Sequence, residues 1–242
     1  MDMKRDYYED IQLFRTRTIL VATLVFMAGL VALPFYVGEY TLYILNLIAI
    51  NAIVAIGLNI LVGYTGQISL GHAGFFAIGA YSCVLLMVKL GLPFVVALPA
   101  AGFISALFGF LVGLPSLRLE GPYLAIATLG FGMASTQIIS HAKFTGGHMG
   151  IEAPPISFGS LVVTTGAGQY AVIVTATVIL TVAAIKLMKP RVGRAFVAIR
   201  DSEIAAEAMG INLSWYKTLS FAVIAFYTGI GGAFMAFALE HV

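Results

Sequence analysis

Long apolar runs dominate this chain of 242 residues. A helix of about 20 apolar residues can cross a ~30 Å hydrocarbon core. Runs of that size cover residues 18–37, 41–62, 66–88, 92–114, 122–140, 168–188 and 217–239. Their apolar positions are continuous rather than alternating, which disfavours a β-barrel. We therefore predict a single-domain, all-α polytopic membrane protein with about seven transmembrane or partly spanning helices.

One long polar stretch, residues 189–217, separates the last two runs. It predicts a short helix over about residues 202–209. Asp201 or Ser202 can cap the helix by accepting hydrogen bonds from its free backbone N–H groups, and Gly210 can end it in a left-handed conformation. Three alanines would keep the helix surface thin. Such a helix is either offered to a partner protein or is an ordinary interfacial connector.

The basic residues predict an orientation. Placing residues 1–17 in the cytosol leaves all but Lys89 and Lys143 of the 13 basic residues on the cytosolic side, as the positive-inside rule requires. The same orientation makes residues 189–216 a cytosolic loop. A net charge of +2 gives no reason to expect nucleic acid as a partner.

Residues 63–81 place glycines and polar side chains between two apolar runs. Such groups are tolerated at membrane depth where protein or a water-filled cavity satisfies the freed backbone, and transporters use broken helices at substrate sites. The stretch is therefore either a helix break beside a translocation path or a tight cytosolic turn before a packed helix. The first interpretation makes Gln67, Ser69 and His72 path residues, and the second makes Gly71 and Gly74 packing residues.

Two other runs carry faces of small residues. Thr128, Gly132 and Ser135 share one side of the 122–140 run, and their two hydroxyls make that side a candidate lining for the path. In the last run, small residues at helical spacing predict a face that packs closely against another helix. These residues are Ala222, Ala225, Gly229, Gly232, Ala233 and Ala236.

The sequence gives no support for several kinds of site and function. The single cysteine, Cys83, can form neither an intrachain disulfide nor a metal site. No acidic residue falls at the centre of a predicted span, which disfavours a carrier coupled to protons or sodium. The chain has no GxxxxGK[ST] loop for ATP and no nucleophile elbow or HExxH motif. We therefore predict a transport subunit rather than an enzyme, without a metal or cofactor of its own.

Four segments resemble the LivM-type permease subunits of branched-chain amino acid ABC importers, to which urea and short-chain amide permeases are similar. They are GLNILVGYTGQISLGHAGFFAIGAY (57–81), LEGPYLAIATLGFG (119–132), TGGHMGI (145–151) and the stretch from Gly193 to Phe234. The resemblance implies a bacterial inner-membrane importer with a second permease subunit, two ATPase subunits that bind ATP and Mg²⁺, and an extracytoplasmic binding protein.

The resemblance also implies that the segment 201–210 docks into an ATPase. Its candidate coupling residues are Asp201, Ser202, Glu203, Ala206, Glu207 and Gly210. The Ile-x-Leu-Pro element of the wider importer motif is absent here, so the docking register is open. Family permeases continue with further glycine-rich helices, so we expect the native chain to extend past Val242. The alternatives are a urea or amide permease and, in a different class, an ion-coupled carrier or channel acting alone.

Overall fold

The computed structural model describes residues 17–117, 119, 121–142, 145–147, 150–158, 161–163, 165–189 and 191–239. The α-helices are α2 (Arg17–Ala32), α3 (Glu39–Leu58), α4 (His72–Leu90), α5 (Phe94–Ser116), α6 (Pro122–His141), α7 (Gly166–Met188), α8 (Arg191–Asp201), α9 (Glu203–Ala208) and α10 (Leu213–Leu239). A 3₁₀ turn, η1 (Leu33–Phe35), follows α2, and a π-helical turn, η2 (Asn59–Tyr64), continues α3. Strands β1 (Ile156–Phe158) and β2 (Leu161–Val163) form an antiparallel hairpin.

The predicted all-α membrane fold is confirmed. In the described part of the chain, six helices are long and apolar enough to cross a membrane, namely α3 with η2, α4, α5, α6, α7 and α10. The first predicted run instead gives α2, whose 16 residues extend about 24 Å at 1.5 Å per residue. Pro34, in the 3₁₀ turn that follows, is one reason why the α-helix stops short. The β hairpin was not predicted.

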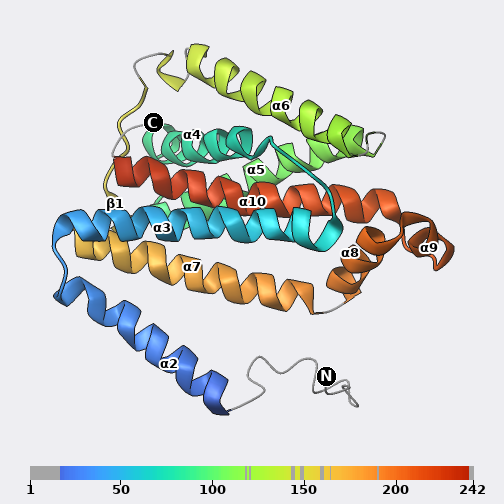
Figure 1. Cartoon of the computed structure of the whole chain (residues 1–242). Coiled ribbons are helices and arrows are strands. Elements are labelled where there is room, and N and C mark those ends of the chain that lie inside the picture. Colours follow the sequence, from blue (N-terminus) through green and yellow to red (C-terminus); the bar gives the residue numbers. More distant parts are fainter. Residues whose placement is uncertain are drawn as a thin grey trace.

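The helices lie roughly alongside one another, with α10 through the middle (Figure 1). Helices α2, α3 and α7 lie on one side of α10, and α4, α5 and α6 lie on the other. Helices α8 and α9 sit together at one end of the bundle, called here the α9 end, and the β hairpin sits at the other, called the hairpin end (Figure 1). Residues 1–16, which hold most of the predicted cytosolic segment, lie outside the described residues.

Close approach to α10 depends on residues without bulky side chains. A Cβ added at Gly232 would meet the Phe76 carbonyl oxygen of α4, and one added at Gly79 of α4 would meet the Gly229 backbone. A Cβ at Gly109 of α5 would meet the Phe221 carbonyl oxygen in the same way. Gly229 and Gly232, on the predicted close-packing face of the last run, therefore lie against two neighbouring helices, α4 and α5.

The last helix begins at Leu213 rather than at 217 because Asn212 caps it. The Asn212 side-chain oxygen accepts a hydrogen bond from the Trp215 backbone N–H at 3.0 Å, as an N-cap residue does. The earlier start places Lys217 inside the helix instead of in the preceding loop.

Candidate functional site

Within residues 63–81, where either a helix break or a tight turn was expected, the structure has a non-helical stretch of six residues. Residues 66–71 are not helical, so α4 begins at His72, six residues after the predicted start of that run. Gly66 turns the chain with a φ of +70°, a conformation that glycine adopts without strain. The Leu70 N–H donates to Thr128 Oγ1 of α6 at 3.0 Å. We call residues 66–71 the broken segment.

Gln67 and Ser69 of the broken segment are buried, with 7% and 4% of their surfaces exposed. The Gln67 amide nitrogen donates to Ser220 Oγ of α10 at 3.0 Å and to Thr65 Oγ1 at 3.2 Å. Its amide oxygen has no partner among the described residues. The Nδ1 atom of His72, at the start of α4, likewise has none. The predicted path residues therefore include buried polar atoms that still have hydrogen-bonding capacity.

The predicted path-lining face of α6 is packed against α4. A Cβ added at Gly71 would meet the Thr128 carbonyl oxygen, and one at Gly74 would lie 3.1 Å from the Gly132 Cα and 3.2 Å from the Ser135 Cβ. The Thr128, Gly132 and Ser135 face is thus a helix contact in this conformation. Gly71 and Gly74, predicted to be packing residues, make that contact from the α4 side.

Helix α9 agrees with the prediction from residues 202–209. The Ser202 hydroxyl accepts from the Ala205 N–H at 3.3 Å and caps the first turn. Gly210, with a φ of +81°, ends the helix, and the Ile211 N–H donates to the Ala206 carbonyl at 3.0 Å. Of the two candidate caps, Ser202 therefore forms the N-cap.

The two sides of α9 have different surroundings. Ala206 is 3% exposed and faces the bundle, so it is not available to a partner in this conformation, contrary to its place among the candidate coupling residues. Ile204 and Met209 are 85% and 83% exposed. Asp201, Ser202, Glu207 and Gly210 are exposed as well. These residues and the two large apolar side chains form what we call the outer face of α9.

Glu203 points back to the bundle rather than away from it. Its carboxylate accepts from Lys217 Nζ of α10 at 2.6 Å, and the two side chains are 39% and 7% exposed respectively. Arg200, at the end of α8, pairs with Asp201 at 3.1 Å and donates to the Gly63 carbonyl at 2.9 Å. The α9 end is thereby tied both to α10 and to the turn before the broken segment.

Helix α8 was missed by the sequence analysis, which treated residues 189–201 as loop. Phe196 and Ile199 are 0% and 2% exposed, and Val192 packs against the core that contains Phe196. Their spacing of four and three residues places them on one face of a helix. That periodicity was present in the sequence, although Gly193 and four charged residues within Arg191–Asp201 obscured it.

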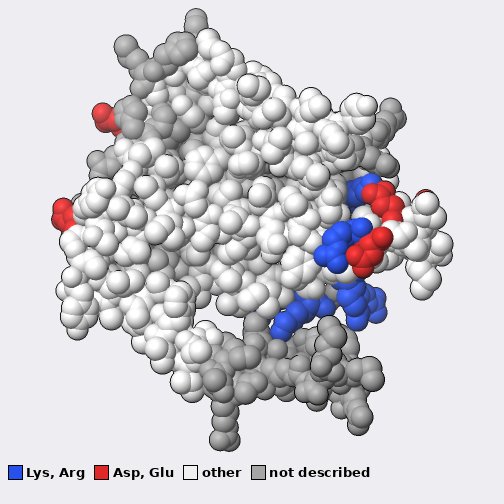
Figure 2. Space-filling view, in the orientation of Figure 1, with Lys and Arg blue, Asp and Glu red and all other residues white. Residues whose placement is uncertain are grey.

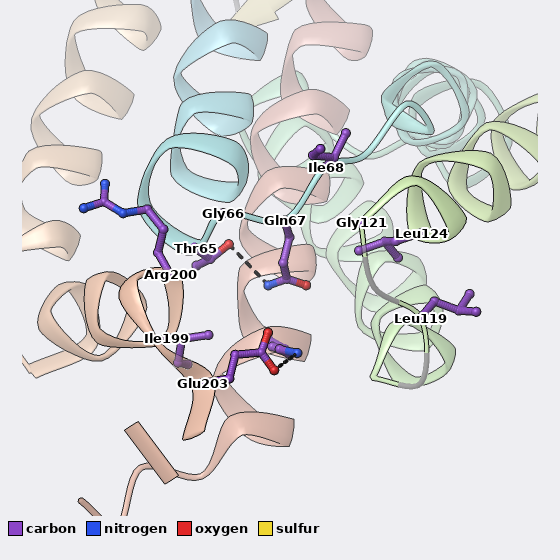
Figure 3. A pocket seen from close by; sticks show the side chains of 11 residues that line it. Thr65, Gly66, Gln67, Ile68, Leu119, Gly121, Leu124, Ile199, Arg200 and Glu203 are labelled. Carbon is purple, nitrogen blue, oxygen red and sulfur yellow. Dashed lines mark hydrogen bonds and ion pairs between the residues drawn. The ribbon is translucent and has the colours of Figure 1, made fainter. Parts of the chain in front are cut away.

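A cavity of about 180 Å³ lies where these elements meet. Figure 3 shows Gln67 and Glu203 pointing into the space between the broken segment, α9 and the start of α6. The lining residues are Thr65, Gly66, Gln67, Ile68, Leu119, Gly121, Leu124, Ile199, Arg200, Glu203 and Lys217. Among the described residues, no group of three His, Cys, Asp or Glu side chains could hold a metal ion.

The charged side chains of the described residues are distributed unevenly. Figure 2 shows the visible Lys and Arg side chains gathered at the α9 end. Lys186, Lys189, Arg191, Arg194, Arg200 and Lys217 belong to elements at that end, whereas Lys89 closes α4 at the other. The other basic residues used to predict the orientation lie outside the described residues, except Arg17 at the start of α2.

Comparison with known proteins shows the family to which the chain belongs. Residues 40–242 match the family model described as branched-chain amino acid transport system / permease component. In an alignment of 247 positions that covers 92% of its length, the chain is 34% identical to the high-affinity branched-chain amino acid transport system permease protein LivM of Escherichia coli (strain K12). In an alignment of 164 positions that covers 57% of its length, it is also 34% identical to the LivM of Salmonella typhimurium. No solved structure matches the chain significantly.

The match does not extend over the whole of either relative. The chain spans 57% of the length of the Escherichia coli protein and 39% of the length of the Salmonella typhimurium protein.

Proposed function

Because the chain belongs to the family of branched-chain amino acid transport system permease components, we propose that it is a membrane-spanning subunit of an ATP-binding-cassette importer. It forms part of the translocation path for branched-chain or other hydrophobic amino acids. The proposed assembly contains a second permease subunit, two ATPase subunits that bind ATP and Mg²⁺, and an extracytoplasmic binding protein. It lies in the bacterial inner membrane.

The observation that carries this proposal is the outer face of α9. Large apolar side chains on the spans can be covered by lipid, but α9 projects from the end of the bundle beyond them (Figure 1). Ile204 and Met209 are more than four-fifths exposed there, beside the acidic Glu207. Exposed apolar side chains with a polar rim are typical of a protein contact. An ATPase groove is the proposed contact.

The distribution of charge supports the proposal that the ATPases bind at the α9 end. The α9 end holds all but Lys89 of the described basic residues from α3 onward, and basic residues collect on the cytosolic side of a membrane protein. The α9 end and the N-terminus are therefore proposed to be cytosolic. The hairpin end would face the binding protein.

The internal contacts of α9 support a mechanical role. The helix is capped at both ends, and the Glu203–Lys217 ion pair ties it to α10, the central helix of the bundle. A shift of α9 would therefore move α10 together with the broken segment, which Gln67 joins to Ser220. In the proposed mechanism, ATP binding closes the ATPases and α9 moves with them. The membrane helices then switch the translocation path between its outward-open and inward-open states.

Co-purification tests the docking step. The chain is co-expressed with its candidate ATPase subunits, carrying either Ile204→Asp or the matched apolar replacement Ile204→Leu. A buried carboxylate without a partner opposes association, so the ATPases should be lost from the Ile204→Asp complex and retained with Ile204→Leu. Equal recovery of the ATPases with both variants would contradict docking through this face.

A further inference from the structure

The cavity at the α9 end has the chemistry of an amino-acid site. We propose that it binds one zwitterionic α-amino acid with an aliphatic side chain, next to α9 and at the inner end of the path. This inference rests on the proposed function and adds to it a location for the ligand. It is carried by three features of the lining: a buried acceptor without a partner among the described residues, a pair of opposite charges and four apolar side chains.

The free acceptor is the amide oxygen of Gln67, and the neighbouring hydroxyls fix its orientation. Thr65 Oγ1 donates its proton to the Leu61 carbonyl at 2.5 Å, and Ser220 Oγ donates its proton to the Lys217 carbonyl at 2.7 Å. Both hydroxyl oxygens can therefore only accept from Gln67, so its amide nitrogen must face them. The amide oxygen is left as a buried acceptor without a partner among the described residues.

An unpaired buried acceptor of this kind destabilises the protein. Gln67 is only 7% exposed and lines the cavity, so a donor that enters the cavity would remove this penalty. An ammonium group is such a donor.

The opposite charges are Lys217 and Glu203. The Lys217 ammonium has three donors, and among the described residues it is seen to use one, on Glu203 Oε2. The remaining donors can hold a carboxylate, and the second oxygen of Glu203 can hold an ammonium group. A zwitterion adds no net charge to this pair, whereas an anion or a cation would leave an uncompensated charge in a partly buried place.

The mostly polar lining also includes a few apolar side chains that an aliphatic side chain can contact. Ile68, Leu119, Leu124 and Ile199 contribute apolar surface to the same cavity, and Leu124 lies across from Gln67 in Figure 3. A single water needs roughly 10–15 Å³ of such space, so about 180 Å³ admits a solute of several heavy atoms. The ligand carboxylate would lie on Lys217, its ammonium between Glu203 and Gln67, and its side chain against the leucines.

Protection of an introduced thiol tests the site in the complete importer with its ATPase subunits, held in lipid nanodiscs. Ile68→Cys is the reporter, because Ile68 lines the cavity and is 47% exposed. The native Cys83 is fully buried and contributes little reaction. Arg194→Cys, on the exposed side of α8, is the matched control at the same end of the molecule. Leu119→Cys replaces the reporter if Ile68→Cys does not assemble.

The probes separate recognition of a zwitterion from simple apolar binding. By mass action, L-leucine at ~10 times its dissociation constant should slow alkylation of the Ile68→Cys thiol about tenfold. Alkylation of the Arg194→Cys thiol should not change. Leucinamide lacks the carboxylate and 4-methylpentanoate lacks the ammonium group, so neither should protect at the same concentration. Adding Gln67→Met to the reporter removes one hydrogen bond to a charged group and should raise the dissociation constant for L-leucine about tenfold. The same L-leucine concentration should then slow alkylation only about twofold.

The outcomes separate this inference from the proposed function. If the importer takes up L-leucine in an ATP-dependent manner but L-leucine does not protect the thiol, the cavity holds only water and the inference is wrong. Equal protection by all three probes also overturns it, because the charged pair would then play no part. If the wild-type importer shows no ATP-dependent uptake of any aliphatic amino acid, the proposed function itself is wrong.

Discussion

Helices α10 and α6 both carry small residues at helical spacing, yet they occupy opposite kinds of position. Helix α10 packs against α3, α4 and α5, and its glycines meet side chains or backbone from several directions. Helix α6 packs against α4. On its other side Tyr123, Met133 and Ile138 are 73%, 67% and 68% exposed. Small residues on several sides of a helix indicate a central position, and one stripe indicates one contact.

The largest expected effect comes from filling a glycine of α10. In Gly232→Leu the new side chain would meet the Phe76 carbonyl oxygen, and backbone in a packed helix cannot easily move away. We expect a loss of about 3 kcal/mol in unfolding free energy, the upper end for overpacking. Gly130→Leu in α6 is the matched control, because a Cβ there meets nothing within 4 Å. Its effect should stay within about 0.5 kcal/mol.

Stability in detergent, followed by SDS titration of the purified chain, measures both variants. Similar losses at Gly232 and Gly130 would show that α10 and α6 do not differ in packing as described.

The next largest effect comes from removing one partner of the ion pair between Glu203 of α9 and Lys217 of α10, and its size should depend on which partner is removed. In Glu203→Ala the 7% exposed Lys217 would lose its described partner, and such an uncompensated charge destabilises by about 3 kcal/mol. In Lys217→Met the remaining Glu203 is 39% exposed and can be hydrated, so the loss should be about 1 kcal/mol or less. Thermal unfolding of the two variants side by side checks this order, which a reversal would contradict.

Removing the hydrogen bond between α6 and the broken segment should have a smaller effect on stability. Thr128→Val leaves the Leu70 N–H of the broken segment without its acceptor, which should lower the unfolding free energy by about 1 kcal/mol. Thr136 is the control, because among the described residues its hydroxyl bonds only to the carbonyls of Gly132 and Met133 in its own helix. Thr136→Val should change stability by no more than about 0.5 kcal/mol.

Hydrogen exchange at Leu70 gives a second readout for these threonine variants. Exchange should accelerate in Thr128→Val and not in Thr136→Val. Unchanged exchange in both would mean that α6 does not hold the broken segment.

Local patterns predicted much of this structure because they depend on neighbours in the sequence. Apolar runs located the spans, and Ser202 and Gly210 located the ends of α9. The boundaries that failed depended on single residues. Asn212 caps α10 early, Gly66 turns the chain out of the helix, and Pro34 follows the shortened α2.

The candidate site could be predicted only in part because its contacts join distant segments. Glu203 was expected to face a partner, but its direction depends on how α9 folds back on α10 and Lys217. The contact between Gln67 and Ser220 joins residues 153 positions apart. Neither hydrophobic periodicity nor a capping pattern can predict a contact between residues so far apart in the sequence. The amphipathic α8 is different, since its apolar spacing was readable and was overlooked.

The central claim is that the outer face of α9 couples ATP hydrolysis to movement of the bundle. Its most direct test is ATP-dependent uptake of labelled L-leucine by proteoliposomes that contain the whole importer and its binding protein. Uptake should fall by about tenfold or more in Ile204→Asp, equivalent to at least ~1.4 kcal/mol of coupling, and should stay near wild type in Ile204→Leu. Equal uptake by both variants, or uptake by the wild type without ATP, would contradict the claim.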